Sequence, residues 1–198
     1  MRSALLRALI AIAIPVIVFI GPGYLIKNLT GRDQYPQTEA AASVPLNFRL
    51  MGYNSDRASE YWAWLGPQGR LAERRFLVAD LAFPLAYGAS LVVGLLISWV
   101  GARKPIGVGW LVAPVVVTVV ADWTENLVHL AQLSHFESMA VVDGTWMDVA
   151  SAATSIKIVA YSLSAVLILV FCGIGLLQGR GVVQQPVPGD DPASRGRP

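Results

Sequence analysis

The chain is poor in the residues from which disulfides and many soluble catalytic sites are built. Its 198 residues include one cysteine, Cys172, and two histidines. A single cysteine excludes an intrachain disulfide, a CxxC redox pair and a zinc knuckle. No GxSxG, HExxH, Walker or GxGxxG motif occurs in the context that each requires. The sequence therefore lacks the common signatures of hydrolases, metalloproteases and nucleotide-binding proteins.

Charge is also scarce. Charged residues make up 14% of the chain and hydrophobic residues 55%, and the mean hydropathy is +0.54. Soluble domains have about 25% charged residues, so this composition favours a membrane protein. The net charge is only +2, and the basic residues are spread over loops and tails. Because they form no basic stripe, nucleic acid is not an expected partner.

Apolar segments long enough to cross a bilayer as helices occur at residues 5–26, 76–100, 106–130 and 149–177. The first is predicted to be an uncleaved anchor, since its apolar run exceeds that of a usual signal peptide. We therefore expect an all-α fold: an integral membrane four-helix bundle over residues 1–181. Residues 182–198 are rich in Pro, Gly and polar residues and are predicted to form a disordered cytoplasmic tail.

Basic residues near the predicted spans give the orientation. They are Arg2, Arg7, Arg103, Lys104 and Arg180, whereas residues 134–148, the predicted loop between the third and fourth spans, contain no Lys or Arg. Since such residues favour the cytoplasmic side, we predict a multi-pass protein of the cell membrane with both termini cytoplasmic. The loop at residues 27–75 disagrees, because it is basic and is placed outside, but its length weakens the rule.

That first loop contains helix signals. Ser55-Asp56 can cap a helix that continues to Leu65, and Gly66-Pro67 should break it. A second helix is then predicted to run from Gln68 straight into the second span. We expect this partly helical extracytoplasmic loop to lie on the outer membrane face and to cover the bundle.

Aromatic and basic residues in the loop suggest contacts with lipid. Tyr61, Trp62 and Trp64 suit the headgroup layer, where they would form an interface belt or a substrate platform. Arg70, Arg74 and Arg75, just before the second span, could bind a lipid phosphate or simply anchor the helix.

A polar stripe interrupts the third span. Asp122, Glu125, Asn126 and His129 share one helical face. At about 1.5 Å of rise per residue, Asp80 in the second span and Lys157 in the fourth lie at the same depth. Because a carboxylate facing lipid is costly, the stripe should face the bundle interior or a wet cavity, with Asp80 and Lys157 as partners.

Pro84 lies one helical turn after Asp80 in the second predicted span. Proline removes the helical hydrogen bond to the carbonyl four residues earlier, which is that of Asp80, so a kink is expected beside this acid. Tyr87 follows one turn later and offers a phenol hydroxyl.

Acid–base chemistry is the sharper interpretation of these groups. Carboxylates held close together in an apolar setting cannot all ionise, so one of them keeps a proton. Asp80 and Asp122 are the candidates, in an order left open, with Glu125 sharing in proton transfer. His129 is a candidate relay, and Tyr87 or Asn126 a hydrogen-bond donor.

Three alternatives are left open for the same residues. The side chains of the stripe can hold neighbouring helices together through hydrogen bonds. Glu125 and His129 have the spacing of a metal-ligand pair, but with no second histidine nearby we expect neither a metal nor another cofactor. Lys157 can be the counter-ion of the acids, or it can extend to the headgroups.

Three short motifs support a resemblance. LGPQGR (65–70), DLAFPLAYG (80–88) and DWTEN (122–126) resemble a pattern in small four-helix bacterial membrane proteins. This resemblance implies the fold and no chemistry. In helix count and buried acids the chain is also loosely similar to sterol isomerase and sigma-2-type proteins and to integral-membrane terpene cyclases. That likeness implies carboxylates that protonate an alkene in an apolar pocket, but fold does not fix function.

We therefore predict a polar pocket in the outer leaflet and an enzyme, an isomerase or cyclase, acting on a lipid or isoprenoid. The alternative is a non-catalytic membrane subunit or lipid-binding protein, in which the same residues fasten helices or a membrane-protein partner. Ion conduction is disfavoured because the cytoplasmic half of the spans has no acid to continue a path.

Overall fold

The computed structural model describes residues 2–35, 41–49 and 52–181. Within them the helices are α1 (Arg2–Thr30), α2 (Ser55–Asp80), α3 (Phe83–Gly101), α4 (Val108–Met139) and α5 (Gly144–Gly181), with short 3-10 turns η1 (Arg32–Gln34), η2 (Ala41–Ser43) and η3 (Leu46–Phe48). No strand occurs in these ranges, and the predicted all-α fold is confirmed. The predicted disorder of residues 182–198 falls outside the described residues.

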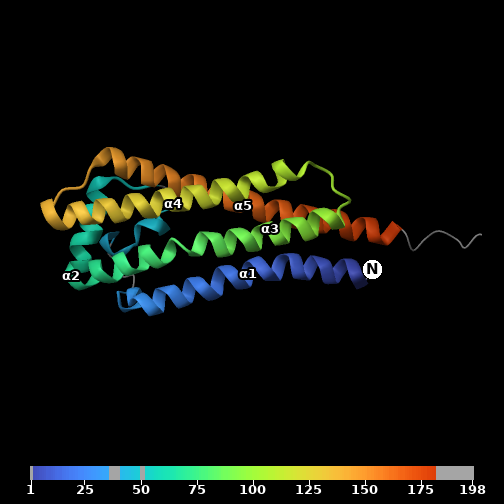
Figure 1. Cartoon of the computed structure of the whole chain (residues 1–198), viewed down its shortest axis with the longest axis horizontal. Helices are drawn as coiled ribbons and strands as arrows, with labels where there is room; N and C mark the ends of the chain where they lie inside the picture. Colours follow the sequence, from blue (N-terminus) through green and yellow to red (C-terminus); the bar gives the residue numbers. More distant parts are fainter. Residues whose placement is uncertain (1, 36–40, 50–51, 182–198) are drawn as a thin grey trace, which may run out of the picture.

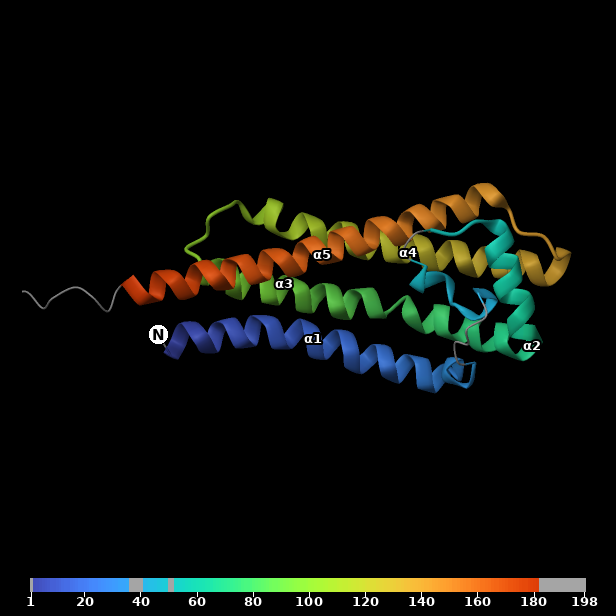
Figure 2. The same ribbon diagram turned by 180° about the vertical axis from the view of Figure 1, so that it is seen from behind.

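The long helices form an elongated bundle. Figures 1 and 2 show α1, α3, α4 and α5 side by side, with the start of α1 and the end of α5 at the same end. Four helical stretches are long and apolar enough to cross a membrane: Arg2–Thr30, Ser55–Gly101, Val108–Met139 and Gly144–Gly179. The chain is thus a multi-pass membrane protein, as the composition predicts.

The opposite end of the bundle, which we call the covered end, is closed by the first half of α2 and by residues 41–49 and 52–54. Gly66 has φ 63° and ψ −179°, so α2 breaks there, as predicted. Its first half lies across the bundle and its second half continues toward α3 (Figure 1). Leu46, Tyr61 and Trp62 pack there against Leu133 of α4 and Met147 of α5. The first half of α2 and the described loop residues next to it thus cover this end of the bundle.

The helix predicted from Gln68 does enter the second span, but it is interrupted there, which the sequence did not indicate. α2 ends at Asp80, Leu81 and Ala82 form a turn, and α3 begins at Phe83 with Pro84 in its first turn. Proline lacks the N–H that a helix interior needs but fits the first turn well, so the helix restarts instead of kinking. The Leu81 carbonyl accepts a hydrogen bond from Trp123 Nε1 at 2.8 Å, which fixes this turn against α4.

α4 is longer than predicted. It continues to Met139, so Ser134 and His135 are helical and do not begin a loop. The sequence from Gln132 to Met139 contains no Gly or Pro to stop the helix, and its polar side chains find partners on α2. Arg74 donates to Ser134 Oγ at 2.9 Å and pairs with Glu137. The connection to α5 is correspondingly short.

Candidate functional site

A cavity of about 780 Å³ lies toward the covered end. Its lining comes from all five helices and the first loop, and comprises Phe19, Ile20, Gly23, Tyr24, Lys27, Arg32, Asp33, Tyr35, Pro45, Asn47, Tyr61, Phe76, Asp80, Phe83, Tyr87, Thr118, Asp122, Lys157, Ile158, Tyr161 and Ser162. Ile20 and Tyr24 of α1 and Ser162 of α5 are exposed on the outside of the bundle. The cavity therefore reaches the lateral surface between α1 and α5.

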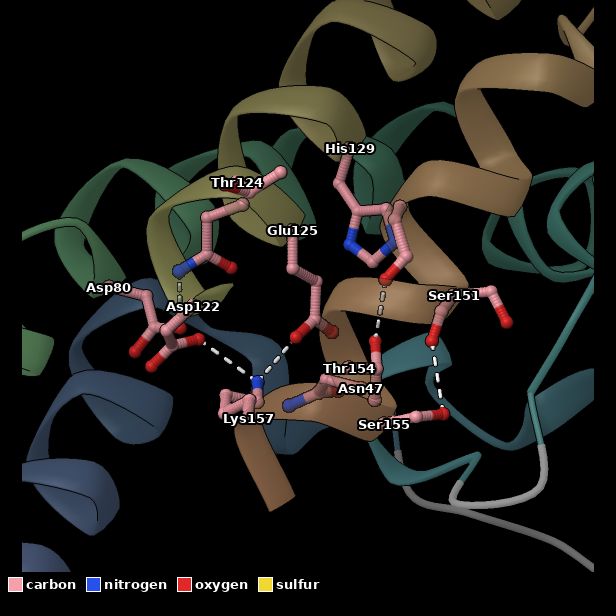
Figure 3. A network of polar contacts seen from close by, with 12 residues as sticks. Asn47, Asp80, Asp122, Thr124, Glu125, His129, Ser151, Thr154, Ser155 and Lys157 are labelled. Atoms are coloured by element: carbon pink, nitrogen blue, oxygen red, sulfur yellow. Dashed lines mark hydrogen bonds and ion pairs between the residues drawn. The ribbon is translucent and has the colours of Figure 1, made fainter. Parts of the chain in front are cut away.

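Lys157 lies at the centre of the polar side of the cavity. We call this side the polar wall; it is formed by Asp80, Tyr87, Asp122 and Lys157. Its Nζ lies 2.9 Å from Asp122 Oδ1 and also pairs with Glu125 Oε2 (Figure 3). Tyr87 Oη donates to the other oxygen of Asp122, Oδ2, at 2.8 Å. Asp122 is thus bonded on both oxygens, by a cation from α5 and a phenol from α3.

Asp80 has a different environment. Its Oδ2 accepts a hydrogen bond from Asn126 Nδ2 at 3.1 Å, and its side chain lies beside Asp122 (Figure 3). Asp80 is 9% exposed and lines the cavity, and no Lys, Arg or His among the described residues pairs with it. The ionisable groups of α2, α4 and α5 lie close together, as predicted. Among these acids, Asp80 is the one that no cation of the described residues pairs with.

Glu125 is fully buried behind this wall, at 0% exposure. One carboxylate oxygen pairs with Lys157, while Oε1 has no hydrogen-bond partner in the described part of the chain. A buried carboxylate oxygen without a hydrogen bond is energetically unfavourable, so this atom lowers the stability of the site.

His129 is hydrogen-bonded to the first loop and, among the described residues, to none of the acids. Its Nε2 shares a 2.6 Å hydrogen bond with the hydroxyl of Tyr53, which also lies 3.3 Å from Thr154 Oγ1. Burial raises the pKa of the Tyr53 hydroxyl, and the charge of Glu125 raises it further, so this phenol stays protonated. The proposed relay role of His129 would have to pass through this network. Tyr53 was not selected from the sequence, because nothing in its spacing relates it to His129.

A second buried ion pair lies where the first loop borders the cavity, a part of the lining that we call the roof. Arg32 Nε is 2.8 Å from Glu73 Oε2, and Arg32 Nη2 donates to Asn47 Oδ1 at 2.9 Å. Tyr61 Oη donates to Glu73 at 3.1 Å, and the Arg32 guanidinium stacks 3.8 Å from the centre of the Phe76 ring. These contacts tie the first loop to α2. The sequence did not identify them, because spacing along the chain does not bring residues 32 and 73 together.

The remaining predicted binding residues lie outside the cavity lining. Trp62 is fully buried and packs on Phe136, so it does not form a headgroup belt as expected. The first half of α2 lies across the bundle and turns this ring inward. Trp64 is 37% exposed, and Arg74 is engaged with Ser134 and Glu137. Of the residues predicted to contact a substrate, Lys157 and Tyr61 line the cavity.

The acids are not arranged as a metal centre. Within the described ranges, no group of three or more His, Cys, Asp or Glu residues is placed to hold a metal ion. The Lys157 ammonium occupies the space between Asp122 and Glu125, and His129 is turned toward Tyr53.

An aromatic cluster adjoins the polar wall. Phe19 of α1, Phe83 and Tyr87 of α3, and Tyr161 of α5 have ring centroids 5.1 to 6.1 Å apart. All four line the cavity, and Tyr87 joins them to Asp122 through its hydroxyl. The cavity thus has an aromatic, apolar part and a polar, ionised part, which is the arrangement that an amphipathic molecule requires.

No protein-family model, curated protein or solved structure matches the chain. The site is therefore interpreted from its own geometry.

Proposed function

We propose that this protein binds an amphipathic lipid or isoprenoid in the cavity between α1 and α5 and performs acid–base chemistry on it at Asp80. The cavity itself is the observation that carries the proposal. Its volume of about 780 Å³ lies within the roughly 300–1,000 Å³ of small-molecule sites. Its lateral position between two membrane helices would let a chain enter from the bilayer.

Asp80 is the best candidate for proton transfer. Lys157 and Tyr87 stabilise Asp122 as a carboxylate, whereas Asp80 has no cation and faces the cavity beside that negative charge. Asp80 has no cation of its own, so a proton or a positively charged group in the cavity must balance its charge. In its protonated form it could give a proton to one carbon of an alkene and, once ionised, take a proton from another; in its ionised form it could perform the two steps in the reverse order. The overall change would be an isomerisation or a cyclisation that returns Asp80 to its starting state.

The other polar groups would then support Asp80. Asn126 positions its carboxyl through the 3.1 Å hydrogen bond, and Asp122 would stabilise positive charge that develops on the substrate. Lys157 keeps Asp122 ionised. The orientation proposed from the basic residues places the covered end outside the cell membrane, so the ligand would come from the outer leaflet.

Mass spectrometry of lipids retained by the purified protein tests the binding step. Gly23 lines the cavity, and a Cβ there would lie 3.6 Å from Phe83 Cζ, so Gly23→Leu should fill the space and deplete the bound lipid. Gly21→Leu is the matched control, because a Cβ at Gly21 meets nothing within 4 Å. Equal lipid content in both variants would contradict the proposed site.

The catalytic step is tested with the lipid so identified. The Asp80→Asn and Asp122→Asn double variant keeps the shape of both side chains and should lose turnover by several orders of magnitude while remaining folded. A double variant with wild-type turnover would refute acid–base chemistry at these residues.

A non-catalytic membrane subunit is the second candidate. The observation that favours it is the Lys157 pairing, which fastens α4 to α5 and needs no substrate to explain it. This alternative predicts that the Asp80→Asn and Asp122→Asn variants lose thermal stability or recovery of a membrane-protein partner, with no chemical change in any lipid.

A further inference from the structure

The site contains more buried negative than positive groups. The carboxylates around the cavity that are at most 9% exposed are Glu73, Asp80, Asp122 and Glu125, and the cations paired with them are Arg32 and Lys157. Four carboxylates thus share two cations. At the rim, Lys27 and Asp33 are both exposed and offset each other. The interior can be neutral only if protons or a positively charged ligand supply the difference.

Both cations are already committed. Arg32 is bonded to Glu73 and Asn47, and Lys157 to Asp122 and Glu125. A phosphate head group would have to displace these carboxylates, and it would add negative charge to a low-dielectric site that already has an excess.

The carboxyl group that lacks a cation, that of Asp80, lies at the surface of the cavity. Asp80 is nine-tenths buried and lines the cavity, yet its only hydrogen-bond partner among the described residues is the amide of Asn126. Beside it, the rings of Phe83, Tyr87 and Phe19 form one wall with Tyr161. Aromatic faces attract cations, and the attraction is stronger where water is excluded. A carboxylate next to aromatic faces is the environment that an alkylated ammonium group prefers.

We infer that the ligand of this cavity carries a cationic head, an amine or a substituted ammonium group, which pairs with Asp80 while its apolar tail lies between α1 and α5. This inference rests on the proposed function, because it assumes that the cavity binds an amphipathic molecule. It adds the sign of the head-group charge and excludes phosphate-headed lipids as the preferred ligand.

Three probes with one tail and different heads test the inference. They are N,N-dimethyltetradecylamine, tetradecan-1-ol and tetradecyl phosphate, each added to the full-length protein in phosphatidylcholine nanodiscs at neutral pH. Each competes with a photoreactive tetradecanol, and empty discs establish how much of each probe enters the bilayer. The readout is the membrane mole fraction at which labelling of residues 19–24 falls by half.

The amine should compete at least about tenfold better than the alcohol, and the phosphate should be the weakest. Asp80→Asn should bring the amine to the level of the alcohol and leave the alcohol unchanged. Glu60→Gln is the control, since Glu60 is an exposed carboxylate paired with Arg57.

Each outcome gives a decision. If amine and alcohol compete equally, or if the phosphate competes best, the cationic head is refuted while the lipid cavity stands. If no probe protects residues 19–24, the proposed function fails as well. The ranking of heads on the unaltered chain already decides the inference, should Asp80→Asn not fold.

Discussion

Lys157 on α5 and Asp122 on α4 form an ion pair with 2.9 Å between Nζ and Oδ1, inside a helical pair that is long and apolar enough to cross a membrane. The same ammonium pairs with Glu125, so one cation holds two buried carboxylates (Figure 3). This relationship connects the packing of the bundle with the lining of its cavity, because Lys157 joins α5 to α4 and both Lys157 and Asp122 line the cavity.

Removing Lys157 should therefore be severe. Lys157→Met leaves Asp122 and Glu125 without their cation and should cost about 3–5 kcal/mol of stability, since a buried charge that loses its partner is strongly unfavourable. Thermal unfolding in detergent, followed by circular dichroism, measures the loss. Arg57→Met breaks an exposed pair with Glu60 and should cost less than about 1 kcal/mol. Comparable melting temperatures for these two variants would contradict the role given to Lys157.

The break in α2 depends on Gly66. Its φ of 63° with ψ of −179° is a conformation that essentially only glycine adopts, so Gly66→Ala should cost about 1–3 kcal/mol. The first half of α2 would lose its position over the bundle, and Trp62 would become exposed. Near-ultraviolet circular dichroism and tryptophan fluorescence report that change. Gly101→Ala, at a glycine with a negative φ and open space around it, should leave both signals unchanged.

The close approach of α1 and α3 depends on Gly94. A Cβ there would lie 2.6 Å from the backbone oxygen of Ala11, so Gly94→Ala must push the helices apart and should cost about 1–3 kcal/mol. Gly21→Ala in α1 meets nothing within 4 Å and should be neutral or slightly stabilising. Melting temperatures of the two variants provide the comparison. A Gly94→Ala variant as stable as Gly21→Ala would show that α1 does not pack on α3 in this way.

The roof of the cavity should depend on Arg32. Arg32→Met leaves Glu73 buried without its cation and removes the bond to Asn47. We expect amide hydrogen exchange in residues 41–49 to speed up by at least about tenfold, because the loop loses its attachment to α2. Exchange in α4 should remain slow. Unchanged exchange in residues 41–49 would mean that other contacts hold this loop.

The sequence predicted the bundle because membrane helices must satisfy their backbone groups internally, which makes apolar length a reliable guide. It also predicted the convergence of Asp80, Asn126, Asp122 and Lys157, since helical rise sets the depth of each group. Helix ends were less predictable. Pro84 restarts a helix where a kink was expected, and α4 passes Ser134 because side chains from α2 meet its polar end.

Contacts made by the first loop could not be predicted from spacing. The Arg32–Glu73 pair and the Tyr53–His129 hydrogen bond join residues 41 and 76 positions apart, and only the folding of the loop over the bundle brings them together. For the same reason Trp62 looked like an interface residue and is buried. Which of Asp80 and Asp122 is paired with a cation also required the structure, in which the Lys157 ammonium reaches Asp122.

Site-mapped photolabelling tests the central claim most directly, namely that the cavity between α1 and α5 holds a lipid chain. A photoreactive long-chain alcohol in nanodiscs should label residues 19–24 and 158–162 in preference to outward surfaces such as Trp110, which is 79% exposed. Gly23→Leu should abolish this preference and Gly21→Leu should keep it. Labelling that simply follows outward exposure, and is the same in both variants, would contradict the account.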